Sequence, residues 1–161
     1  MERSIGMVEF SSIARGIYAA DQMVKISDVE IVTASSVCPG KYIAIVNGEV
    51  AAVKESVQKG TEEAGEFLVD SIIIPNVHRG VFPAIVGTAD PPDIDALGII
   101  ESYSLSAMVI AADAILKSAE LTAIELRLGT GLGGKAYFTF TGEVAAVSNG
   151  IEVGSKSLGD K

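Results

Sequence analysis

Apolar and polar residues follow the same order of patterns twice along this chain. Each half opens with a short apolar run, residues 5–10 and 97–101, which predicts a strand. A serine stands after each run in the position of a helix N-cap, Ser12 or Ser104. Apolar residues then recur at helical spacing, so each half should place one helix on its sheet. The stripes are Ile13, Ile17, Ala20 and Val24 in one half and Leu105, Val109, Ala112 and Leu116 in the other.

Alternating runs after each helix predict paired strands, at 29–35 with 42–46 and at 123–128 with 137–141. A second helix should begin near Glu49 in one half and Glu143 in the other. The first half continues into a fourth strand at 67–75 and a short helix near 77–85. The second half stops while entering its fourth strand, so we expect either a longer natural chain or an open sheet edge, which proteins rarely tolerate.

Identical motifs in the two halves indicate an internal duplication. The hexapeptide GEVAAV occurs at 48–53 and 142–147, and Gly-x-x-Glu and Ala-Ala-Asp-x-x-x-Lys elements precede each copy at matching distances. A repeat of this length predicts two small domains, 1–88 and 96–161, with a proline-containing linker between them. The expected fold class is α/β, of the α+β kind, with two tandem ferredoxin-like domains.

Composition narrows the class of protein. Apolar residues make up 48% of the 161 residues and charged residues 20%, so we expect apolar surface to be buried between copies of the chain. No apolar run is long enough to cross a bilayer, and no signal segment precedes the first repeat, which predicts a soluble, cytoplasmic protein. The net charge of −9 and the lack of a Lys/Arg run argue against nucleic acid as a partner.

The two halves differ most in the loop between their paired strands. One loop contains Ser36, Val37, Cys38, Pro39 and Gly40; the other runs from Gly129 to Gly134. The second loop formally satisfies the dinucleotide fingerprint G-x-G-x-x-G. That motif requires a helix to follow, whereas residues 135–141 alternate like a strand. We therefore interpret it as a flexible loop of small residues.

Cys38 is the only cysteine and stands on a predicted turn. A single cytosolic cysteine is most often a buried hydrophobe, but a loop tip is a poor place to bury one. One thiolate cannot hold a metal, whereas three related by a threefold axis could hold an iron-sulfur cluster or zinc. The only histidine, His78, has no partner that the sequence identifies, and Glu9 and Glu101 recur in both halves as scaffold residues would. No nucleophile-base constellation is visible, so we do not expect an enzyme.

These motifs together resemble the bacterial microcompartment (BMC) shell family in its tandem-domain form. Within it, the Cys-Pro-Gly-Lys loop of residues 38–41 is most similar to the iron-sulfur shell proteins of propanediol-utilisation compartments. The resemblance covers nearly the whole chain. It implies a homotrimer of six domains, a pseudohexameric tile in a cytoplasmic microcompartment shell, with loop tips around a central pore. It also implies contacts with other shell proteins and with an encapsulated redox enzyme, and no membrane.

The resemblance assigns roles to particular residues. The pore would be lined by Ser36, Val37, Cys38, Pro39, Gly40, Gly131, Leu132, Gly133 and Gly134. Cys38 from three chains would bind one [4Fe-4S] cluster for electron transfer or redox sensing, because the second loop carries Leu132 in place of a cysteine. Lys25 and Lys117 match lysines at the tile edge, although helix-end cations also suit the helix dipole. The alternatives are a gated metabolite pore without metal, or a small-ligand regulator or enzyme on the same fold.

Overall fold

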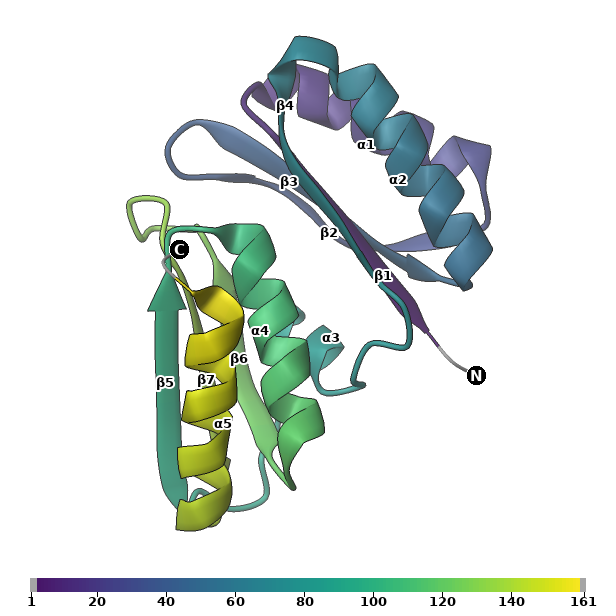
Figure 1. Ribbon diagram of the computed structural model, residues 1–161. Helices are drawn as coiled ribbons and strands as arrows, with labels where there is room; N and C mark the ends of the chain where they lie inside the picture. The colour runs from purple at the N-terminus through teal and green to yellow at the C-terminus, as the bar shows by residue number, and fades with distance from the viewer. Residues whose placement is uncertain (1–2, 160–161) are drawn as a thin grey trace. The chain divides into compact units, whose positions relative to one another are not determined.

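The structure is a computed structural model that describes residues 3–159 of the chain. Its contacts group into two units, one ending at Val77 and the other beginning at His78. Figure 1 shows the same arrangement in each unit, a sheet with two long helices on one face. The α/β class and the duplicated architecture expected from the sequence are confirmed.

The first unit has the element order expected from its apolar periods. Its elements are β1 (Ser4–Phe10), α1 (Ile13–Ile26), β2 (Val29–Val37), β3 (Lys41–Gly48), α2 (Val50–Ala64), the 3₁₀ turn η1 (Gly65–Phe67) and β4 (Leu68–Ile74). The strands lie in the order β2-β3-β1-β4, and every neighbouring pair is antiparallel. The core lies between the sheet and its helices, where Val8 and Phe10 meet Met23 of α1 and Val57 of α2.

The second unit repeats this plan over a three-stranded sheet. Its elements are α3 (Val81–Val86), β5 (Ala96–Ser102), α4 (Leu105–Ser118), β6 (Thr122–Leu128), β7 (Ala136–Gly142) and α5 (Val144–Leu158). The strand order is β5-β7-β6. The fully buried rings of Phe138 and Phe140 stack with their centroids 5.3 Å apart in its core. The short helix α3, which the sequence placed in a first domain of residues 1–88, packs on β6 and α4 of this unit.

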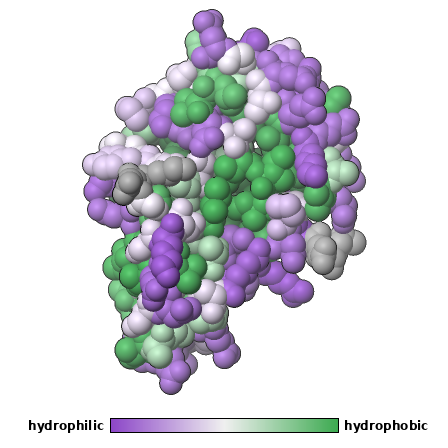
Figure 2. All heavy atoms as spheres, in the orientation of Figure 1, coloured by the Kyte–Doolittle hydropathy of each residue, from purple (hydrophilic) through white to green (hydrophobic). Residues whose placement is uncertain are grey.

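The two sheets differ in whether their first strand, β1 or β5, lies inside the sheet or at its edge. In the first unit β1 pairs with β3 on one side and β4 on the other. In the second unit β5 pairs with β7, and within residues 3–159 no strand occupies its other side. The side chains of Leu97 and Ile99 on β5 are 54% and 56% exposed. Figure 2 shows apolar residues, in green, among polar ones on the face of the molecule that it presents.

Both predicted helix caps are confirmed. The hydroxyl of Ser12 accepts the backbone N–H of Arg15 at 3.3 Å, and that of Ser104 accepts the N–H of Ala107 at 3.2 Å. Each cap satisfies a donor that the first helical turn would otherwise leave unpaired. The described helices include none that is both long and apolar enough to span a bilayer.

Half of one predicted helix face is wrong: Ala20 and Val24 of α1 pack on the core as expected, but Ile13 and Ile17 do not. The second stripe is buried as expected, but in α1 Ile13 and Ile17 are 41% and 54% exposed. The face that packs on the sheet instead carries small residues, with Gly16 directly against Tyr42, where a Cβ would come within 2.7 Å of that side chain. Small residues let the helix approach the sheet closely, and the larger isoleucines consequently point away from it.

Candidate functional site

The Cys38 loop is the tip of the β2–β3 hairpin. The last paired residues are Val37 and Lys41, so the tip consists of residues 38–40 alone. The peptide between Cys38 and Pro39 is cis, and Gly40 has a φ of +69°, a conformation that favours glycine. Cys38 is half-buried and its thiol is free. The hairpin therefore presents one soft ligand at its end.

The corresponding tip in the second unit, between β6 and β7, is longer and contains no thiol. The backbone N–H of Gly129 donates to the carbonyl of Lys135 at 3.0 Å, and that of Lys135 donates to Leu132 at 3.2 Å. Glycines 129, 131, 133 and 134 all have positive φ. β7 begins at Ala136, so no helix N-terminus faces this loop and the dinucleotide fingerprint lacks its required context.

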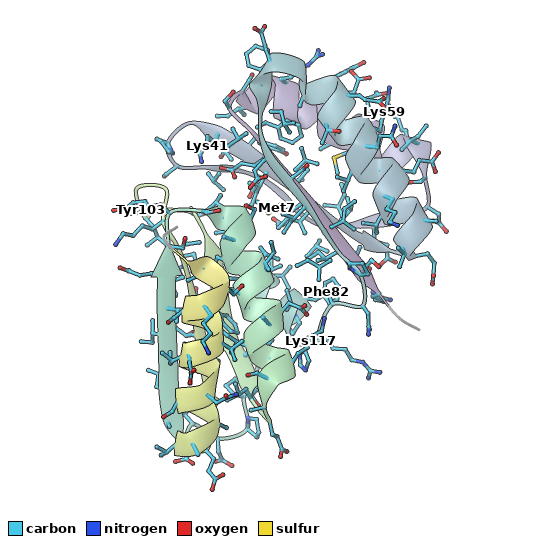
Figure 3. The ribbon with its side chains drawn as sticks, viewed as in Figure 1. Met7, Lys41, Lys59, Phe82, Tyr103 and Lys117 are labelled. Carbon is cyan, nitrogen blue, oxygen red and sulfur yellow. The ribbon has the colours of Figure 1, made fainter. Side chains whose placement is uncertain are left out.

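An ion pair lies at the base of each tip, in the same place in both units. Glu9 on β1 stands opposite Ile43, and Lys41, two residues back along β3 on the same face, pairs with it diagonally. In the second unit Glu101 stands opposite Tyr137, and the Nζ of Lys135 lies 2.9 Å from Glu101 Oε1. Figure 3 shows Lys41 near the end of its hairpin.

The surroundings of the two pairs differ. The side chain of Glu9 is 5% exposed, whereas that of Glu101 is 65% exposed. The hydrogen bond to Glu101 raises the pKa of Lys135, and the nearby ring of Tyr103, 5.2 Å from Nζ, also favours the cation. A carboxylate as buried as Glu9 depends on its cation, because an unpaired charge is costly away from water.

Sequence reasoning identified Glu9 and Glu101 as repeated residues but missed their partners. The signal was the Gly-Lys dipeptide, which occurs at 40–41 and again at 134–135 beside the two loops. Both members of the pair are thus duplicated, and their contact follows from the strand register. This places a charged pair next to the one cysteine of the chain.

The predicted edge lysines end equivalent helices. Lys25 Nζ lies 2.6 Å from Asp21, and Lys117 Nζ lies 2.7 Å from Asp113, each pair one helical turn apart. Both ammonium groups remain reachable from solvent, since the side chains are 65% and 41% exposed. Each lysine can therefore contact an external partner, and its positive charge also stabilises the C-terminal end of its helix.

His78 has a local structural role. Its Nδ1 accepts the backbone N–H of Gly80 at 3.1 Å, and its own backbone N–H donates to Asp113 Oδ1 at 2.7 Å. These bonds fix the entry to α3.

A metal site cannot be assembled from one copy of the described chain. Between residues 3 and 159 no three His, Cys, Asp or Glu side chains are grouped as metal ligands. Cys38 contributes one thiolate, and zinc or iron-sulfur sites take three or four protein ligands. The residues present fit such a group only where several copies each bring a Cys38.

Comparison with protein families places both units in one family. A model described as "BMC domain" matches residues 4–77 and again residues 96–161. The two matches coincide with the two sheets and their helices. The duplication seen in the sequence is thus a duplication of this domain.

Individual relatives agree with the family match. The chain is 38% identical to the bacterial microcompartment shell protein PduT of Citrobacter freundii, over all of this chain and 88% of that protein. It is 33% identical to the carboxysome assembly protein CcmO of a Synechocystis strain, over 95% of this chain and 56% of that protein. A solved structure of a microcompartment protein from Desulfitobacterium hafniense superimposes with a TM-score of 0.93 at 44% identity, covering 97% of this chain and 87% of that one.

Proposed function

This chain belongs to the BMC-domain family of bacterial microcompartment shell proteins, with two such domains in tandem, and we propose that three copies assemble into one tile of a shell. Two domains per chain give a threefold assembly six domains in a ring. The exposed apolar side chains of α1, Ile13, Ile17 and Tyr18, support burial against a neighbouring copy. In this proposal the chain is a structural component and not an enzyme.

We further propose that the hairpin tips of the three copies surround the central pore. The Cys38 loop and the Leu132 loop are equivalent tips of duplicated units, so both kinds of tip would alternate around the ring. The lining would consist of Ser36, Val37, Cys38, Pro39 and Gly40 with Gly131, Leu132, Gly133 and Gly134. Because Leu132 stands in the second loop, the ring would contain three thiols and not six.

The pore would hold a [4Fe-4S] cluster through the three Cys38 thiolates. When bound, such a cluster carries single electrons, so the tile would transfer electrons across the shell or sense redox state. The chain itself supplies the thiolates and the hairpins that present them. The observation that carries this proposal is the free, half-buried thiol of Cys38 on a hairpin tip, in a chain whose residues 3–159 group no three His, Cys, Asp or Glu side chains as metal ligands.

Partners of the tile follow from its place in a shell. We propose that Lys25 and Lys117 meet neighbouring tiles or other shell proteins, since both ammonium groups lie on the surface at equivalent helix ends. We propose a redox enzyme inside the compartment as a further partner, with which the pore would exchange electrons. A gated metabolite pore without metal is the second candidate, because the same tips would line it.

Anaerobic purification tests the cluster. Native mass spectrometry should give a trimer, and iron analysis about four irons per trimer, with Cys38→Ser losing the iron and keeping the trimer. Ser36→Ala, on β2 two residues before Cys38, is the control and should keep the iron. Zinc in place of iron would indicate a site of three thiolates with an open position. A monomer, or iron retained in Cys38→Ser, would contradict the proposal, and a metal-free trimer after reconstitution would favour the metabolite pore.

A further inference from the structure

The Cys38 tip receives little support from its surroundings. At Gly40 no atom of a described residue other than Gly40 and its two chain neighbours lies within 4 Å of the position that a Cβ would take. The tip consists of residues 38–40, and the pairing of Val37 with Lys41 closes it. The position of the thiol is therefore set by the base of the hairpin, where β3 begins.

Lys41 ties that base to the neighbouring strand. It is the first residue of β3, and its ammonium group pairs with Glu9, which lies on β1 in the middle of the sheet. The carboxylate is almost completely buried, so it holds the lysine side chain in one place. The pair thus links the first residue after the tip to an interior strand of the sheet.

We propose that the Glu9–Lys41 ion pair positions Cys38 for the shared metal site, an inference that rests on the function proposed above. A site built from three chains repeats any error in the thiol position three times. Such sites need their ligands held to within about 0.5 Å by supporting groups. The pair is a positioning element and does not itself touch the metal.

The second unit provides an internal control. Glu101 and Lys135 form the same diagonal pair, but the tip beside them carries Leu132 and has its own backbone hydrogen bonds. If the pair serves only the general fold of the domain, its removal should lower the free energy of unfolding, more for the buried Glu9 than for the exposed Glu101, without a separate effect on the thiol. If it positions the thiol, only the pair in the first unit should affect Cys38.

Two single variants distinguish an effect on the position of the Cys38 thiol from an effect of the charge near it. Glu9→Gln leaves a cation near the thiolates, and Lys41→Met leaves an anion, so a purely electrostatic effect on the cluster would have opposite signs. Loss of positioning should instead weaken cluster retention in both, by about 10–100-fold, as is typical when groups that support metal ligands are removed. The charge swap Glu9→Lys with Lys41→Glu restores the pair and should restore retention. Glu101→Gln and Lys135→Met are the matched controls and should retain the cluster like the unaltered protein.

The metal-free trimer gives a second readout that does not need the cluster. Alkylation of Cys38 by iodoacetamide should change in rate in both single variants and return toward the original rate in the charge swap, with the two control variants unchanged. If a single variant fails to fold, the double variant Glu9→Gln with Lys41→Met takes its place. It removes both charges and should still release the cluster. Unchanged retention and alkylation in the first-unit variants, or equal effects from the second-unit variants, would overturn the inference. Absence of iron in the unaltered protein would refute the cluster alone, because the alkylation rates would still report the positioning.

Discussion

Asp113 and Lys117 form an ion pair on α4, with Nζ 2.7 Å from Oδ2, and the other oxygen of Asp113 accepts the backbone N–H of His78. The duplicated pair on α1, Asp21 with Lys25, has the same spacing and lies on the surface. Asp113 is 10% exposed in its side chain, whereas Asp21 is 48% exposed. In the second unit the aspartate of this motif therefore also binds the segment that leads into α3.

We predict that Asp113→Ala lowers the free energy of unfolding by about 1–3 kcal/mol, because it leaves a partly buried N–H of His78 without its acceptor. Asp21→Ala should change it by about 0–1 kcal/mol, as is usual for an exposed pair. Urea unfolding of both variants measures the difference. Equal losses would show that the bond to His78 adds nothing.

The edge assignment predicts a loss of assembly without a loss of fold. Lys25→Ala and Lys117→Ala should each leave the trimer intact and weaken the lateral association of trimers into sheets. Native mass spectrometry reports the trimer, and electron microscopy of concentrated protein reports the sheets. Lys156→Ala, on α5 with a comparable exposed partner in Glu152, is the control and should assemble normally. Dissociation of the trimer itself in Lys25→Ala or Lys117→Ala would contradict the assignment.

Local signals in the sequence predicted local structure well. Ser12 and Ser104 cap their helices because an N-cap depends on the serine and the backbone donors two or three residues away. Both second helices start directly after Glu49 and Glu143, as their apolar faces indicate. Duplication reinforced each of these signals, since the same pattern occurred twice.

Features that depend on tertiary packing were not predictable in the same way. Ile13 and Ile17 are exposed because Gly16 makes the close contact with Tyr42 of the sheet. The helical spacing of apolar residues had instead predicted that the two isoleucines face the sheet. The Glu9–Lys41 pair was missed because the partners meet only when the register of β1 and β3 is known. The loop that contains Cys38 was found from its residue types, whereas the group that supports it required the structure.

Gly98 provides a test of close packing in the second unit. A Cβ at this position would lie 2.4 Å from the ring of Phe140, which is fully buried. Gly98→Ala should therefore force the ring to move and lower the free energy of unfolding by about 1–3 kcal/mol. Thr122→Ala, at an exposed position of β6, should stay within about 0.5 kcal/mol. Urea denaturation midpoints compare the two, and an unaffected Gly98→Ala would mean that the core adjusts freely around Phe140.

Tyr137 predicts how stability changes at alkaline pH. Its hydroxyl donates to Glu125 Oε2 at 2.5 Å, and this hydrogen bond, followed by burial, raises the pKa of Tyr137 above the ordinary 10.0. The folded protein therefore keeps the phenolic proton at pH values where the unfolded chain has lost it. The resulting stability is fully present below pH 10.0 and is lost as the pH rises through the folded pKa.

Replacing Tyr137 with phenylalanine should remove this contribution while Glu125 keeps its partner Arg127, 2.6 Å away. The difference in unfolding free energy between the original protein and Tyr137→Phe should then be constant below pH 10.0 and shrink above it. Lys135 and Tyr42, whose pKa values are also raised, remain in both proteins and cancel in the comparison. Urea unfolding from neutral pH to above the folded pKa measures the difference. A difference that stays constant across this range would mean that the phenol titrates alike in the folded and unfolded chains, and that its bond to Glu125 does not favour the protonated form.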